Sequence, residues 1–108
     1  MPVASDFRLV LVTCADLSEA RKIARAVVEK RLAACVNILT IPVESIYSWK
    51  EKIENTSEHL LLIKTSVKKL AALEKEVLRL HSYDNPEFIA IALESGSAPY
   101  LAWLSEAL

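Results

Sequence analysis

The feature that most restricts the fold of this chain is a long stretch, residues 32–65, which predicts two β-strands joined as a hairpin. β-branched and aromatic residues dominate both ends of the stretch, while its middle, residues 54–59, is polar. The first strand, from Cys35 to Trp49, exceeds the roughly 3–10 residues usual in small domains. Pro42 lies inside it without an N–H to donate, which predicts an edge strand with a bulge or bend. We therefore expect a hairpin that projects beyond its own domain and touches another molecule.

Length and composition are typical of one globular domain, which we expect to span residues 1–108. The net charge is −1 and no run of Lys or Arg is present, so we expect no nucleic-acid partner. No apolar run approaches the roughly 18 residues that span a bilayer, so we expect no membrane partner. The first six residues lack the pattern of a secretory signal, and we expect a cytoplasmic protein with reduced cysteines.

Strands and helices alternate along the rest of the chain. Residues 6–14 alternate like a strand, and Asp16 followed by Glu19 predicts a capping box for a helix that ends near residue 31. The apolar stripe of this helix consists of Ala20, Ile23, Ala24, Val27 and Val28. Ser66 is expected to cap a second helix. Its buried stripe consists of Leu70, Leu73, Val77 and Leu80.

The C-terminal part predicts one more strand, residues 87–94, and a short helix with Pro99 in its first turn. The expected apolar side of this helix consists of Tyr100, Trp103 and Leu104. The full order is β-α-β-β-α-β plus a helix. This order is typical of an α+β, ferredoxin-like sandwich with both main helices on one face of the sheet.

The strands are apolar on both sides, although the two main helices can cover only one face of the sheet. The short terminal helix cannot cover the whole opposite face. The apolar strand residues are Val10, Val12, Leu60, Leu61, Leu62, Ile63, Phe88, Ile89, Ile91 and Leu93. An exposed apolar patch of this size indicates an association site. We expect the uncovered faces of several subunits to pack together, with the hairpin pairing along a neighbour's edge.

Five segments resemble the CutA family, the divalent-cation tolerance proteins, in order and spacing. They are Val28–Ile38, Ser45–Trp49, Glu58 with Leu62–Thr65, Leu80–Glu87 and Tyr100–Leu104. The resemblance implies a ferredoxin-like subunit, a homotrimer similar in shape to the PII signalling proteins, and a cytoplasmic role in tolerance of copper and other divalent metals. It implies no settled biochemical activity.

The chain departs from the family pattern in two loops. Trp49-Lys50-Glu51 stands where the family usually has Trp-x-Gly. Either Glu51 takes a left-handed backbone, at a cost of roughly 1–2 kcal/mol, or the turn is rebuilt around Glu54-Asn55. Ser82 replaces a proline between the histidine and the tyrosine, which we expect to loosen that loop.

The resemblance also bears on metal binding. Some bacterial members bind copper through a cysteine late in the first strand and two consecutive histidines before the loop, positions that here read Val12, Leu80 and His81. Only His81 is kept. Cys14 lies two residues further on the same side of the strand and is a possible substitute. No cofactor is required, and the expected ion is copper or another divalent cation.

Two candidate metal ligands also have structural interpretations. Cys35, after two alanines, is either a small packing residue or a soft ligand at a subunit junction. His81, in the last turn of a helix, is either a hydrogen-bonding terminal residue or a metal ligand. His59 is expected to be a surface residue.

Lys64 within Leu-Leu-Leu-Ile-Lys-Thr needs a polar partner, and we expect a carboxylate, Glu58 or Glu87, unless Lys64 serves as a binding-site cation. The aromatic residues Tyr47, Trp49 and Tyr83 are expected interface anchors. The residues expected to line a cleft between subunits are Lys64, Tyr83, Glu87, Tyr47, Trp49 and Glu58, with His81 and Cys35.

Catalysis is not expected, because the sequence has no Cys-x-x-Cys or His-x-x-x-His spacing and no evident nucleophile with a base. The single glycine, Gly96, excludes glycine-rich phosphate loops. Three functions remain: a trimeric metal-binding protein of the CutA type, a PII-like module that binds a protein or small anion between subunits, and a purely structural trimer.

Overall fold

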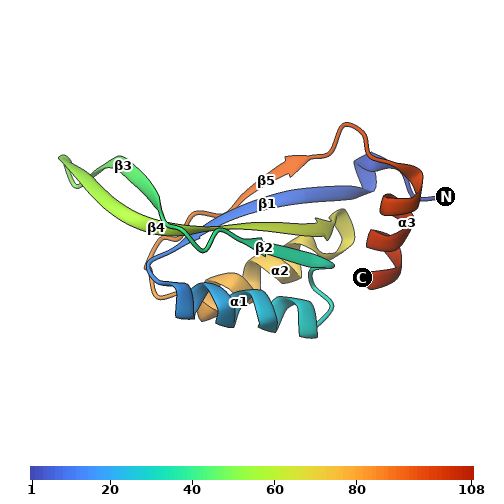
Figure 1. The fold of residues 1–108 in the computed structure, drawn as a ribbon, viewed down its shortest axis with the longest axis horizontal. Coiled ribbons are helices and arrows are strands. Elements are labelled where there is room, and N and C mark those ends of the chain that lie inside the picture. The colour runs from blue at the N-terminus through green and yellow to red at the C-terminus, as the bar shows by residue number, and fades with distance from the viewer.

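Two layers make up the fold, an antiparallel sheet and two helices that cover one of its faces (Figure 1). The computed structural model describes all residues, 1–108. The helices of this layer are α1 (Leu17–Glu29) and α2 (Val67–Leu80). The strands are β1 (Phe7–Cys14), β2 (Cys35–Ile38), β3 (Val43–Trp49), β4 (Lys52–Ser66) and β5 (Ile89–Ala92). The order β2-β4-β1-β5, with β3 paired to β4, confirms the predicted ferredoxin-like sandwich.

Smaller elements lie at the end of the sheet where both chain termini are found (Figure 1). A short 3₁₀ helix, Ala4–Asp6, precedes β1, and α3 (Ala98–Ala107) follows β5. Leu101 and Leu104 of α3 pack on Phe7 and Ala34. The prediction for this helix was right for Leu104 but wrong for its aromatic residues, Tyr100 and Trp103, which are 43% and 45% exposed. Because α3 is apolar almost all round, its periodicity could not show which side is buried.

The hairpin projects from the body, as predicted, and the molecule measures 48 × 26 × 25 Å (Figure 1). Pro42 lies just before β3 and divides the predicted long strand in two, β2 and β3. Both pair with the single 15-residue strand β4, Cys35 opposite Lys64 and Trp49 opposite Lys52. The polar residues 54–59 are therefore part of a strand. Residues 54–57 lie on the projecting half of β4, which faces water rather than the core, and Glu58 is buried at its base.

The hairpin turn is formed by Lys50 and Glu51, whose φ angles are 51° and 68°. Both are left-handed, as the favoured two-residue hairpin turns require. We expect Glu51→Gly to raise the free energy of unfolding by about 1 kcal/mol, because glycine adopts this conformation without strain. Urea denaturation would measure the gain. Glu54→Gly, in the interior of β4, is the matched control and should lower stability instead; equal effects would contradict the turn assignment.

The core lies between the sheet and the two helices. Val10, Val12 and Cys14 of β1 join Leu61 and Ile63 of β4. The helices contribute Ala20, Ile23, Val27, Leu73 and Val77 to the same cluster. The predicted helix stripes are thus confirmed, except that Val28 is 40% exposed. None of the helices has the length and apolar character needed to cross a membrane.

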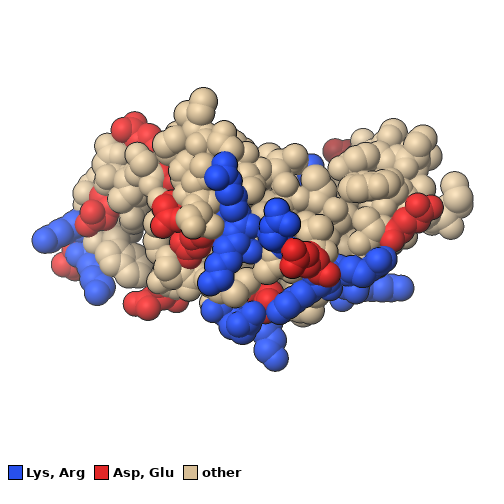
Figure 2. Space-filling view, turned by 60° about the horizontal axis from the view of Figure 1, so that its bottom comes forward, with Lys and Arg blue, Asp and Glu red and all other residues tan.

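The outer surface of the helical layer is charged. Figure 2 shows Lys and Arg side chains along this layer, which is the lower side of Figure 1 turned toward the viewer. The basic residues of α1, α2 and the position after α1 are Arg21, Lys22, Arg25, Lys30, Lys68, Lys69, Lys75 and Arg79. Lys30 and Arg79 both pair with Glu76, and these contacts hold the pKa of Glu76 down at about 2. These charges keep the outer surface of the helices hydrated. The apolar surface of the molecule is therefore on the opposite face of the sheet.

Candidate functional site

The face of the sheet turned away from α1 and α2, here called the back face, is largely uncovered. Strand alternation and register place these residues on it: Leu9, Leu11, Cys35, Asn37, Leu60, Leu62, Lys64, Ile89 and Ile91. Ile89 and Ile91 are 50% and 44% exposed, and the leucines are half-buried. Because α3 packs only at the end of the sheet around Phe7 and Ala34, the rest of this apolar face stays uncovered in the single chain, and its role in association stays a prediction.

Lys64 lies half-buried on the back face. Its ammonium group donates a hydrogen bond to Asn37 Oδ1 and lies 3.7 Å from Cys35 Sγ. Within one chain Lys64 pairs with neither Glu58 nor Glu87, the two carboxylates expected as its partners, so pairing with either of them stays a prediction. Glu58 and Lys64 are six residues apart on β4, which separates them by about 20 Å at roughly 3.3 Å per residue.

A second set of polar residues, here called the carboxylate cluster, consists of Glu58, Tyr83 and Glu87. Glu58 is only 7% exposed, and Tyr83 donates a hydrogen bond to its Oε2 at 2.9 Å. Burial, this hydrogen bond and the charge of Glu58 all raise the pKa of Tyr83. Burial and the charge of Glu58 also raise the pKa of Glu87. These three residues therefore lie close together in one chain without Lys64, and their expected place in a cleft between subunits stays a prediction.

His81 is buried beside this cluster and uses both ring nitrogens. Nε2 lies 2.8 Å from the Thr13 carbonyl oxygen and must donate to it, while Nδ1 accepts from the Tyr83 N–H at 3.1 Å. This pattern fits the neutral ring with its proton on Nε2. A metal ion could reach His81 only if one of these hydrogen bonds were released.

Glu19 is a residue whose role the sequence did not reveal. Asp16 accepts a hydrogen bond from the Glu19 N–H at 2.8 Å, as the predicted cap requires. The Glu19 carboxylate instead accepts from Ser82 N at 2.6 Å and Ser82 Oγ at 2.9 Å. The expectation that Ser82 loosens its loop was therefore wrong, because Glu19 ties both donors of Ser82 to α1.

The three predicted metal ligands occupy different environments. Cys14 is fully buried on the helix side of the sheet, and burial, with smaller effects from nearby carboxylates, raises the pKa of its thiol to about 12. Cys35 is half-buried on the back face beside Lys64. Within one chain no three His, Cys, Asp or Glu residues gather where they could hold a metal ion. A metal site built on these residues therefore remains a prediction, and Cys35 is the most accessible of the three.

Two more predicted residues lie on the projecting hairpin. Tyr47 and Trp49 are opposite Glu54 and Lys52, and the two aromatic side chains are 41% and 46% exposed. The hydrogen bond of His59 to the Leu39 carbonyl, at 2.9 Å, secures the strand pairing near its base, so His59 is more than the surface residue that we expected.

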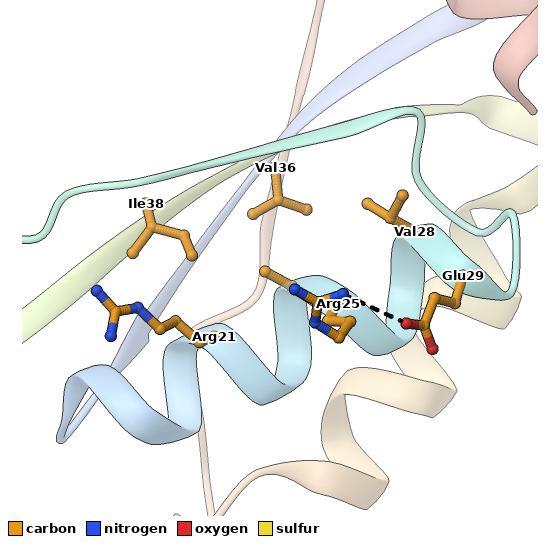
Figure 3. Close-up of a pocket in the computed structure, with 7 residues that line it drawn as sticks. Arg21, Arg25, Val28, Glu29, Val36 and Ile38 are labelled. Atoms are coloured by element: carbon orange, nitrogen blue, oxygen red, sulfur yellow. Dashed lines mark ion pairs between the residues drawn. The ribbon is translucent and has the colours of Figure 1, made fainter.

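A shallow groove of about 420 Å³ lies between α1 and β2 (Figure 3). Val36 and Ile38 point into it from β2, while Arg21 and Arg25 stand at its rim on α1. Arg25 pairs with Glu29 at 3.7 Å, and both side chains are exposed. None of the predicted site residues lines this groove, and no buried polar group points into it, so it does not form the site.

Comparison with known proteins gives consistent matches. The family model described as CutA1 divalent ion tolerance protein matches residues 8–107. Protein CutA of Mus musculus is 50% identical over 95 residues, which are 88% of this chain and 53% of that protein. Divalent-cation tolerance protein CutA of Archaeoglobus fulgidus is 40% identical over 97 residues, 90% of this chain and 93% of that protein. The chain spans about half the length of the mouse and human relatives.

Solved structures show the same fold. The crystal structure of CutA from Xylella fastidiosa has a TM-score of 0.91 at 42% identity, over 95% of this chain and 98% of that chain.

Proposed function

This chain belongs to the CutA1 divalent ion tolerance protein family, and from that premise we propose that it is a non-enzymatic, cytoplasmic homotrimer that binds divalent metal ions reversibly. The observation that carries the proposal is the uncovered back face, which brings an accessible thiol, Cys35, into an apolar surface suited to self-association. Copper is the first ion to test, because thiolate and imidazole ligands suit it.

The single chain offers too few ligands in one place for a closed metal site. Ligands contributed by more than one subunit would remove this shortage, because every copy in a closed symmetric assembly presents an equivalent Cys35. Cys14 fits a ligand role poorly, since its buried thiol stays protonated at neutral pH. Metal binding therefore depends on assembly in this proposal.

Native mass spectrometry of the purified protein, with and without copper or zinc, tests both parts of the proposal. We expect an assembly of about 36 kDa, three chains of 12.0 kDa, that takes up a fixed number of ions. Cys35→Ser should weaken copper binding at least tenfold, because it removes the soft ligand. Cys14→Ser is the matched control and should leave binding unchanged; an assembly whose copper affinity is the same in all three proteins would overturn the assigned ligand.

A second candidate function is a PII-like module that binds a partner between subunits. The projecting hairpin, with exposed Tyr47, Trp49 and Ile53, favours a protein partner. A small anion fits less well at the carboxylate cluster, because Glu58 and Glu87 would repel it. Capture of a defined partner by the wild-type protein, lost in Trp49→Ala without loss of copper binding, would favour this function over metal binding.

A further inference from the structure

Glu58 is a buried acid without a cation. It is 7% exposed, its side chain accepts a hydrogen bond from the neutral Tyr83 hydroxyl, and none of the ion pairs within the chain includes it. Glu87 lies near enough for the charge of Glu58 to act on it. Glu87 is exposed, but burying the Glu58 carboxylate without a cation is costly, so the cluster is electrostatically incomplete in a single chain.

Lys64 is the complementary case, a half-buried cation without an acid. Its ammonium group contacts only neutral side chains, Asn37 and Cys35, and no carboxylate lies within 4 Å. It occupies the same face of β4 as Leu62, within the apolar back face. A lysine held in such a surface gains most from a charged partner when the surface is covered.

The separation of the two groups decides how they can meet. They lie on the same face of one continuous strand, about 20 Å apart, so they cannot meet within a single chain. A second copy packed against the back face with an offset along the strand can. We propose that, when back faces pack together, Lys64 of each copy pairs with Glu58 and Glu87 of a neighbouring copy. This inference rests on the self-association proposed above.

The pairing would give the assembly its geometry. Apolar contacts between Leu9, Leu11, Leu62 and their counterparts are non-directional and permit several offsets between copies. A charge pair that forms at only one offset selects that arrangement. In a closed ring, Lys64 of each copy contacts the carboxylate cluster of the next copy, so every cluster gains a cation.

Charge reversal tests the pairing. We expect Lys64→Glu and Glu58→Lys each to weaken assembly at least tenfold, because each places like charges together. The double variant restores opposite charges and should assemble within about threefold of the parent. Native mass spectrometry across a dilution series measures this, with circular dichroism as a check on folding. Lys75→Glu, on the outer surface of α2, is the matched control and should assemble normally.

If the charge-reversal variants fail to fold, a double-mutant cycle with uncharged side chains tests the same pairing. Lys64→Met, Glu58→Gln and their combination preserve side-chain volume, and their effects on assembly should be non-additive by at least threefold. If the parent assembles but the two substitutions have additive effects on assembly, the pairing is overturned while the proposed assembly stands. The same holds if the parent assembles but the double charge reversal does not restore assembly. A parent that stays monomeric overturns the proposed assembly as well. Unchanged assembly in Lys64→Met, together with stabilisation by zinc that Glu58→Gln abolishes, would show that a metal ion completes the cluster and would overturn the pairing.

Discussion

Leu11→Glu is expected to leave the protein as a folded 12.0 kDa monomer. Leu11 lies at the centre of the back face, opposite Leu62 on one side and Ile89 on the other. A carboxylate there remains solvated in the single chain but would be buried without a partner in every copy of the assembly. The cost is several kcal/mol per site, which corresponds to a dissociation constant raised at least a thousandfold. Native mass spectrometry and sedimentation velocity would measure the change.

The matched control is Leu78→Glu. Leu78 lies on α2, 44% exposed and on the charged helical surface, so the same chemical change there should leave the mass unchanged. If Leu11→Glu still assembled like the parent, the back face would not be the contact surface. If both variants dissociated, the helical surface would be part of the contact.

The sequence predicted the fold well because each element has a strong local signal. Alternation, the Asp16 and Ser66 caps and the position of Pro99 each agree with the observed elements. The hairpin turn was harder to locate, because Lys50-Glu51 lacks the Asn-Gly pattern that indicates two left-handed residues. The polar run at residues 54–59 wrongly indicated the position of the hairpin turn, since polar residues are tolerated in the part of a strand that projects into water.

The candidate site was predicted in part. The family-like segments pointed to Tyr83 and Glu58, which the structure joins by a hydrogen bond. The sequence could not show where Lys64 finds a carboxylate. Glu58 and Lys64, six residues apart on one strand, share a face but cannot touch within one chain. Glu19 was missed for a different reason. The Glu19 side chain can either complete the capping box or accept long-range hydrogen bonds from Ser82, and the local sequence cannot show which of the two forms.

His81→Ala is expected to lower the free energy of unfolding by about 2–4 kcal/mol in metal-free buffer. The imidazole joins the end of β1 to the loop after α2, through the Thr13 carbonyl and the Tyr83 N–H. Its removal leaves the buried Thr13 carbonyl without this partner, at about 1–3 kcal/mol, and the partly buried Tyr83 N–H without its partner, at about 1 kcal/mol. Urea denaturation at neutral pH with a chelator present would measure the loss apart from any metal effect.

His59→Ala is the matched control, because the ring of His59 makes one hydrogen bond, to the Leu39 carbonyl, and is only half-buried. It should lower the free energy of unfolding by about 1 kcal/mol, clearly less than His81→Ala. The comparison separates the two interpretations of His81. A large loss without metal means that the ring holds the loop carrying Tyr83, so weaker copper binding in the same variant would follow from displaced structure. A loss no greater than that of His59→Ala would mean that the ring is structurally dispensable, and any effect of His81→Ala on copper affinity would then indicate direct coordination.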